Sequence, residues 1–233
     1  MMEEKIIRTW VSAHPKCRAG KTRPKKFQIL MSNGRKIFRK EDSSELAIKN
    51  EVEILGLLGD CERVPKLIKR TPVALSTRYI DGDLLDEVAN KLNCFDCFNI
   101  SLQIIGIVGE IHGRGIVHGD IRLWNFICDT EKRIFLFDFE YSYIVGKKYS
   151  RQTLEYFNKH HRLYLRTAAE EWCDVFKCIW CLWLESKSWP LCIFFSQTAL
   201  FVYLISFFRK NVCSFVDVLN TATRKYSAGK LVK

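Results

Sequence analysis

The sequence is short of several features that mark common classes of protein. Proline is scarce, with 5 among 233 residues, and there is no internal repeat or low-complexity tract. The first ten residues are charged and hold no apolar stretch, so we expect no signal peptide and an intracellular, cytoplasmic or nuclear protein. Hydrophobic residues make up 48% and charged residues 27%, which excludes a disordered chain and suits one domain or two small lobes.

Glycine is scarce in the first part of the chain, where only Gly20 and Gly34 precede Gly56. No G-x-G-x-x-G loop exists there. The segment around Gly20 ends like a P-loop, but Pro15 stands where that motif requires its first glycine, so a P-loop is excluded.

The ten cysteines lack the spacing of a shared zinc site. Cys94 and Cys97 form one C-x-x-C pair and Cys178 and Cys181 another, but about eighty residues separate the two pairs. We therefore expect free thiols in a reducing compartment.

Acidic residues are fewer than basic ones, and the net charge of +11 is concentrated at the two ends. Residues 1–40 carry a net +10 and residues 209–233 a net +5, which leaves the middle mildly acidic at −4. Plain solvated termini are the favoured interpretation. An anionic partner of the basic N-terminus, such as nucleotide phosphates, nucleic acid or a membrane surface, stays open as the alternative.

One stretch near the end of the sequence is long and apolar enough to suggest a membrane span. Residues Leu191 to Phe208 contain no charge and meet the lower length limit of a span. We favour a buried helix because Ser196, Gln197 and Thr198 lie in its middle, and a membrane span stays open as the alternative.

The apolar pattern predicts strands and one helix first and helices later, an α+β arrangement. Asn33-Gly34 predicts a tight hairpin turn, and Ser43-Ser44 a helix start. Strands are expected at 27–32, 35–40, 65–68, 73–80, 116–117, 126–127 and 134–139. Helices are expected after residue 44, at 83–92, at 97–113 and from Ala168 onward, with a long loop and a helical turn at 141–165.

The strongest chemical signal is the segment His118-Gly119-Asp120-Ile121-Arg122-Leu123-Trp124-Asn125, with Asp138-Phe139-Glu140 after the next hairpin. Transfer of a phosphoryl group to a hydroxyl needs a carboxylate at the hydroxyl, and a second carboxylate and an amide oxygen for Mg²⁺. We expect Asp120, Asn125 and Asp138 to converge on one point. His118 is expected to bond the backbone rather than move a proton.

This pattern resembles the H-R-D-x-x-x-x-N and D-F-G motifs of the protein-kinase-like superfamily, closest to small atypical or fungal and bacterial kinases with an H-G-D loop. The resemblance implies a two-lobed fold with a strand-rich N-lobe and a shortened helical C-lobe. It implies ATP and Mg²⁺ as cofactors, Asp120 as catalytic base, and Asn125 and Asp138 as metal ligands. Arg122 takes the place of a Lys that touches the γ-phosphate.

The N-terminal half supports the same resemblance. Lys40, with Lys36 as second choice, resembles the ATP-binding Lys, and Glu51, preferred over Glu53, its helix partner. Tyr79 and Ile80 resemble the hinge that holds adenine. The segment Trp172-Cys173-Asp174 resembles the helix whose Asp braces the catalytic loop. The implied organisation is a basic N-terminal extension over 1–26, an N-lobe over 27–80 and a C-lobe over 81–233.

The sequence departs from the kinase pattern at the phosphates and after Asp138. Without a glycine loop, a basic loop with Lys25 or Lys26 would have to cover the phosphates. Glu140 replaces the Gly of D-F-G and places a carboxylate near the metal. We expect a protein serine/threonine kinase with ATP and a protein substrate as partners. A pseudokinase or nucleotide-binding scaffold, and a small-molecule kinase of the aminoglycoside or choline kind, stay open.

Overall fold

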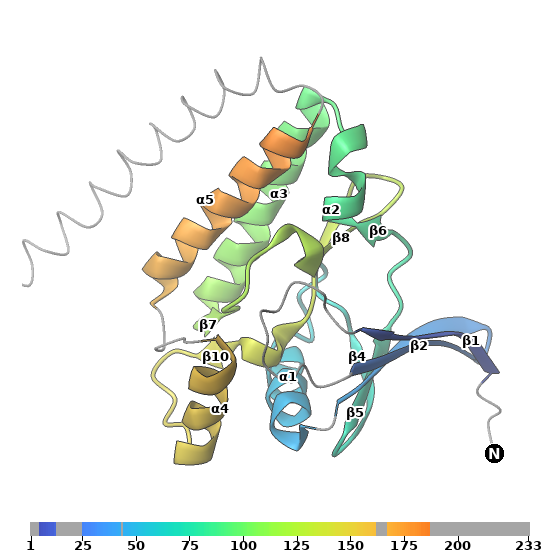
Figure 1. Ribbon diagram of the computed structural model, residues 1–233, viewed down its shortest axis with the longest axis vertical. Helices are drawn as coiled ribbons and strands as arrows, with labels where there is room; N and C mark the ends of the chain where they lie inside the picture. Colours follow the sequence, from blue (N-terminus) through green and yellow to red (C-terminus); the bar gives the residue numbers. More distant parts are fainter. Residues whose placement is uncertain (1–4, 13–24, 43, 162–166, 187–233) are drawn as a thin grey trace, which may run out of the picture. The chain divides into compact units, whose positions relative to one another are not determined.

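A computed structural model describes residues 5–12, 25–42, 44–161 and 167–186. The rest of the chain, including the apolar stretch 191–208 and the basic C-terminal end, lies outside the described residues. The described elements form strands first and long helices later, the α+β organisation that the sequence predicts (Figure 1).

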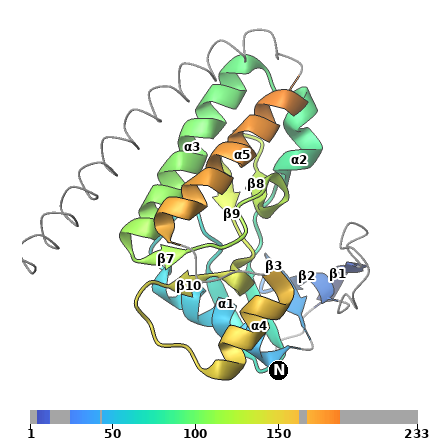
Figure 2. The same cartoon turned by 60° about the vertical axis from the view of Figure 1, so that its left-hand side comes forward.

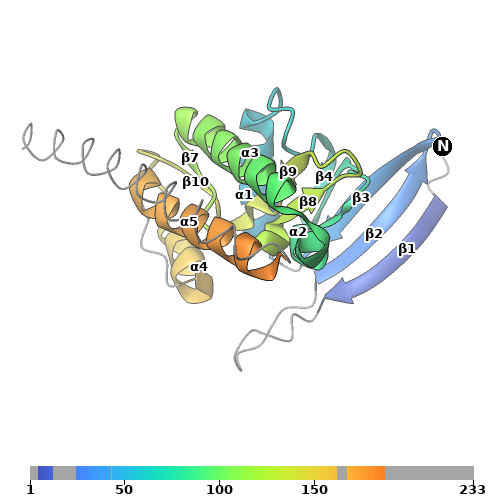
Figure 3. The same ribbon diagram turned by 90° about the horizontal axis from the view of Figure 1, so that it is seen from above.

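A five-stranded antiparallel sheet in the order β1-β2-β3-β5-β4 makes up the N-terminal part. Figure 3 shows β1, β2 and β3 to one side of the long helices. Helix α1 (Glu45–Leu57) connects β3 to β4. The strands of this sheet are β1 (Lys5–Ser12), β2 (Lys25–Ser32), β3 (Arg35–Glu41), β4 (Leu67–Thr71) and β5 (Ala74–Arg78).

Local signals set the boundaries of β2, β3 and α1. Asn33 and Gly34 both have positive φ angles, 50° and 71°, as a two-residue hairpin turn requires. The Ser44 side chain accepts a hydrogen bond from the Ala47 backbone N–H and caps α1. Ile48, Ile54 and Leu55 of α1 are buried.

Two long helices dominate the C-terminal part. Helix α3 (Cys94–Gly113) and helix α5 (Ala168–Glu185) lie side by side (Figure 2). The buried Trp183 Nε1 of α5 donates a hydrogen bond of 3.0 Å to Ser101 Oγ of α3. The other elements are β6 (Asp83–Leu84), α2 (Leu85–Val88), β7 (Ile116–Val117), β8 (Phe126–Cys128), β9 (Ile134–Leu136), β10 (Tyr143–Ile144) and α4 (Arg151–His161).

Among the described residues, α3 alone is long and apolar enough to cross a membrane by length and composition. Its buried face is rich in isoleucine and it packs against α5. Core helices share these properties, so the helix by itself indicates no membrane.

The short strands are connected by the loops that contain the candidate residues Asp120, Asn125 and Asp138. Strands β8 and β9 pair in an antiparallel hairpin with β6 beside them, and β10 pairs with β7. Gly82 precedes β6 and has no room for a side chain, because a Cβ atom there would lie 2.5 Å from the Cys128 carbonyl oxygen of β8. Gly82 is therefore a site of close packing between the chain before β6 and strand β8.

Four local predictions need correction. Strand β1 and the start of β2 lie within the predicted extension 1–26. The strand predicted over 134–139 ends at Leu136, because Asp138 has a φ angle of 64°. The helix predicted over 83–92 is divided into β6, α2 and a separate turn at Ala89–Lys91, and α4 is an eleven-residue helix where a long loop with a helical turn was expected.

Candidate active site

The loop between β7 and β8 carries Asp120, Arg122 and Asn125. The Asn125 side-chain amide Nδ2 donates hydrogen bonds to the backbone oxygen of Asp120 at 2.7 Å and to its Oδ2 at 3.0 Å. Arg122 Nε lies 2.7 Å from the other carboxylate oxygen, Oδ1. Both oxygens of Asp120 are therefore held in a fixed orientation by neighbours on the same loop.

His118 is fully buried beneath this loop. Its Nε2 donates to the Phe137 carbonyl oxygen at 3.0 Å, and its Nδ1 accepts from the Asp120 backbone N–H at 3.3 Å. These partners assign the neutral tautomer with the proton on Nε2. The ring contacts the backbone, as the sequence predicts, and supports Asp120 from below.

Asp138 is joined to the same loop through the residue before it. The Phe137 backbone N–H donates to the Asn125 carbonyl oxygen at 3.1 Å, while the Phe137 carbonyl accepts the His118 bond. The left-handed backbone of Asp138 then turns its side chain away from the β9 direction. Asp120, Asn125 and Asp138 thus belong to one hydrogen-bonded neighbourhood.

Lys40 of β3 brings the sheet into contact with that neighbourhood. Its ammonium lies 2.7 Å from Glu51 of α1, 2.5 Å from Asp138 and 2.9 Å from Glu140. Lys36, the second candidate, instead pairs with the exposed Asp81 at 3.2 Å. The structure places Lys40 and Glu51 together, the pair that the sequence selects, and Glu53 pairs with Lys147 elsewhere.

Burial and charge compete in the pKa values of this cluster. Burial alone would lower the pKa of Lys40, but the charges of Asp138, Glu140 and Glu51 raise it well above its ordinary value. Burial raises the pKa of Asp138, yet Lys40 outweighs it and holds the pKa well below the usual range. For Glu51 burial wins, and its pKa rises to about 7 despite Lys40. Lys40 is therefore charged, and Asp138 is ionised at neutral pH.

Glu140, which stands where D-F-G has its glycine, is fully buried. Besides Lys40 it pairs with Lys25, at the start of β2. Burial raises its pKa, but Lys40 and Lys25 overcome that effect and lower it. The sequence predicts a carboxylate near the metal at this position, and the structure shows it bound to two lysines.

The donor set fits a divalent cation of the oxygen-binding type. Carboxylate oxygens of Glu51, Asp138 and Glu140 lie within 4.8 Å of one another. The Lys40 ammonium binds all three, and Asp138 is the most exposed of them, so Asp138 is the carboxylate that could ligate a metal. The Asn125 bonds to Asp120 use the amide nitrogen, so the amide oxygen points the other way and is the atom that could ligate a metal. Hard oxygen ligands of this kind are what Mg²⁺ prefers.

Tyr79 and Ile80 lie in the connection from β5 to β6, where the chain passes from the sheet to the helical part. The Tyr79 backbone N–H donates to the Lys36 carbonyl oxygen at 3.3 Å, and the Lys36 ammonium lies 5.3 Å from the centre of the Tyr79 ring. The position is the one expected of a hinge.

The loop that carries Asp120 is held by Glu171 and not by Asp174. Glu171 of α5 accepts hydrogen bonds from the backbone N–H groups of His118, at 3.0 Å, and Gly119, and from His112 Nε2 at 2.7 Å. Asp174 pairs with Lys177 on the same helix at 3.2 Å. The residue of α5 that holds this loop therefore lies one helical turn closer to the start of the helix than the sequence indicates.

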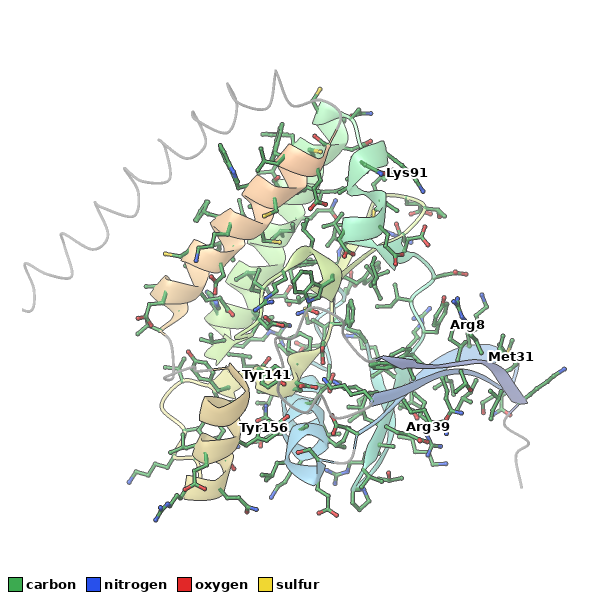
Figure 4. The ribbon with its side chains drawn as sticks, in the orientation of Figure 1. Arg8, Met31, Arg39, Lys91, Tyr141 and Tyr156 are labelled. Atoms are coloured by element: carbon green, nitrogen blue, oxygen red, sulfur yellow. The ribbon has the colours of Figure 1, made fainter. Side chains whose placement is uncertain are left out.

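A second contact that the sequence did not reveal comes from Asn50, next to Glu51. Its Nδ2 donates to the backbone oxygens of Glu140 at 2.9 Å and Ser142 at 2.7 Å. On the far side, the Tyr141 ring stacks on Tyr156 of α4, with centroids 6.2 Å apart (Figure 4). The segment after Asp138 is therefore held between α1 and α4.

Comparison with known proteins gives consistent results. A family model described as the RIO domain matches residues 4–164. A probable myosin light chain kinase of Dictyostelium discoideum is 29% identical over 111 residues, which cover 42% of this chain and 35% of that protein. NUAK family SNF1-like kinase 2 of Rattus norvegicus is 27% identical over 135 residues, covering 54% of this chain and 21% of that protein.

The kinase PK-1 of the Cydia pomonella Granulovirus is a structural neighbour. Its TM-score is 0.54 at 22% identity, covering 67% of this chain and 63% of that one. This likeness shows a protein-kinase-like, two-lobed α+β fold. The chain spans about a third and a fifth of the lengths of the two curated relatives.

Proposed function

The chain belongs to the RIO domain family of atypical kinases, and from that premise we propose that it is an ATP-dependent protein serine/threonine kinase. The reaction would transfer the γ-phosphate of Mg-ATP to a hydroxyl group. The bond from the γ-phosphorus to ADP breaks, a bond to the hydroxyl oxygen forms, and the hydroxyl proton passes toward a carboxylate.

One observation carries the proposal: Asp120, Asn125 and Asp138 are joined in a single hydrogen-bonded neighbourhood that Lys40 contacts from the sheet. Proximity of a proton acceptor, metal-binding oxygens and a cation is the arrangement that in-line phosphoryl transfer requires. If these groups lay on separate surfaces, one triphosphate could not contact all of them.

Each predicted residue then has a role consistent with its contacts. Asp120, oriented by Asn125 and Arg122, would accept the proton of the attacking hydroxyl. Asn125 and Asp138 would hold Mg²⁺, which neutralises charge on the phosphate oxygens when bound. Lys40, kept in place by Glu51, would bind phosphate oxygens, and the chain at Tyr79 and Ile80 would hold adenine.

Purified full-length protein incubated with Mg²⁺ and γ-labelled ATP tests the proposal. We expect label on serine or threonine of a generic acceptor such as casein, and slow release of inorganic phosphate without an acceptor. Asp120→Ala should lower both rates by about 10³-fold or more. Glu155→Ala, which removes an exposed carboxylate of α4, is the matched control.

A nucleotide-binding scaffold is the second candidate, favoured by the engagement of Lys40 with three carboxylates. A scaffold would bind Mg-ATP without turning it over, and Asp120→Ala would then change no rate. The kinase proposal fails if wild type and Asp120→Ala show the same background transfer.

A further inference from the structure

The charged cluster around Lys40 has a buried side and an accessible side. Side chains of Lys40 and Glu140 are 3% and 0% exposed, whereas those of Lys25 and Asp138 are 23% and 28% exposed. A ligand that approaches the cluster therefore meets one cation and one carboxylate. Lys25 is that cation.

The register of the sheet explains why Lys25 reaches this cluster and Lys26 does not. Phe27 is the cross-strand partner of Lys40, and Lys25 lies two residues before Phe27, on the same face of β2. Lys26 is on the opposite face, where it pairs with Glu41 at 3.3 Å. The strand thus directs one of two adjacent lysines to the site.

We propose that Lys25 is a phosphate-binding residue. Without nucleotide it pairs with Glu140, and when Mg-ATP binds its ammonium moves from Glu140 to the phosphates. This inference rests on the proposed function, because it assigns a role at the same nucleotide site. In a chain without a glycine-rich loop, Lys25 supplies from a side chain some of the phosphate contacts that such a loop supplies from its backbone.

The exchange leaves no buried charge without a partner. When Lys25 leaves, Glu140 keeps the Lys40 ammonium at 2.9 Å. The lysine side chain is flexible and binds phosphate as a point charge, so its head can move while β2 stays fixed. The polyphosphate brings the negative charge that draws Lys25 away.

Binding of Mg-ATP and of adenosine to the full chain, measured by isothermal titration calorimetry, tests this assignment. Lys25→Met should weaken Mg-ATP binding about tenfold or more and leave adenosine binding unchanged. Lys26→Met, the adjacent lysine on the other face, should bind both ligands as wild type does. Thermal unfolding of each variant shows whether it is folded at the assay temperature.

Glu140→Gln adds the second half of the test. Lys25 is then released, so Mg-ATP should bind several-fold more tightly, and this gain should disappear in the double variant Lys25→Met/Glu140→Gln. The double variant also removes both members of the Lys25–Glu140 ion pair, so a loss of stability in Lys25→Met that comes from breaking this pair does not obscure the result.

Three outcomes overturn the inference. Equal Mg-ATP affinities in Lys25→Met and wild type would show that Lys25 does not bind phosphate. An equal gain from Glu140→Gln with and without Lys25 would show that Glu140 acts by its charge alone. Weaker Mg-ATP binding in Glu140→Gln, with ATP binding unchanged in EDTA, would make Glu140 a metal ligand. If the wild type itself binds no Mg-ATP, the proposed function fails, and this assignment fails with it.

Discussion

Glu171 shows how one buried side chain can fix the loop that carries Asp120. Its two carboxylate oxygens receive three N–H donors, two of them from the backbone just before Asp120. We expect Glu171→Gln to reduce the free energy of unfolding by about 3 kcal/mol, because an amide offers one acceptor oxygen and turns N–H groups toward donors. Urea titration followed by circular dichroism measures the loss.

Asp174→Asn is the matched control, on the same helix and one turn away. Its carboxylate pairs with the exposed Lys177, so the loss should be about 0.5 kcal/mol. A loss as large as that of Glu171→Gln would show that the brace is shared between the two acids.

Because Glu171 is ionised in the folded protein, its contribution to the free energy of unfolding should depend on pH. Burial raises the pKa of Glu171, but the hydrogen bonds from His112 and from the backbone N–H groups of His118 and Gly119 outweigh it, so the folded pKa lies below the ordinary 4.5. The unfolded chain then binds more protons than the folded chain as the pH falls below about 4.5. The stabilisation is complete above that pH and is lost below it.

The measurement is the difference in unfolding free energy between wild type and Glu171→Gln, from pH 7 to pH 3.5. We expect a constant difference down to about pH 5 and a smaller one at lower pH. A difference that grows as the pH falls would mean that the folded state raises this pKa.

At the scale of single elements, α1 is attached to the site by neighbouring residues. Glu51 pairs with Lys40, and Asn50 donates to two carbonyls of the segment after Asp138. Asn50→Ala leaves those buried carbonyls unpaired and should cost about 2 kcal/mol of unfolding free energy. Lys49→Ala, at an exposed position of the same helix, should change it by less than about 0.5 kcal/mol.

Thermal or urea unfolding of the two variants decides the point. Should Asn50→Ala be as stable as Lys49→Ala, the segment after Asp138 would be held by other contacts, with the Tyr141–Tyr156 stack as the first candidate.

Elements with local signals could be predicted from the sequence. The Asn33-Gly34 turn fixes the β2–β3 hairpin because both residues tolerate positive φ, and Ser44 supplies the acceptor that α1 needs at its start. The candidate site could be predicted for a similar reason, because one short loop and one hairpin connect Asp120, Asn125 and Asp138.

Residues placed by tertiary packing could not be predicted in this way. Strand β1 lies in a basic segment and owes its place to pairing with β2. Glu171 could have been found from periodicity, since Val175, Cys178 and Leu182 repeat its position on the buried face of α5 while Asp174 falls off it. The Lys25–Glu140 pair joins residues 115 apart, and no local pattern relates them.

For residues 5–186 as a whole, the contacts of the site are also contacts between the sheet and the helical part. Lys40 binds Asp138, Lys25 binds Glu140, and α1 packs against the turn at Phe139–Tyr141. Breaking the sheet would expose three carboxylates that Lys40 neutralises. We therefore expect the sheet and the helices to unfold together rather than one after the other.

Buried thiols on both sides make this testable. Cys61, after α1, is 1% exposed and Cys97 of α3 is 0% exposed, whereas Cys173 and Cys181 of α5 are exposed. In urea below the unfolding midpoint, with iodoacetamide labelling read by mass spectrometry, Cys61 and Cys97 should report the same free energy of opening. The exposed pair should react at every urea concentration and serves as the internal control. If Cys61 became reactive in urea that leaves Cys97 protected, the segment after α1 would open before α3, and the ion pairs of the site would be too weak to couple the two parts.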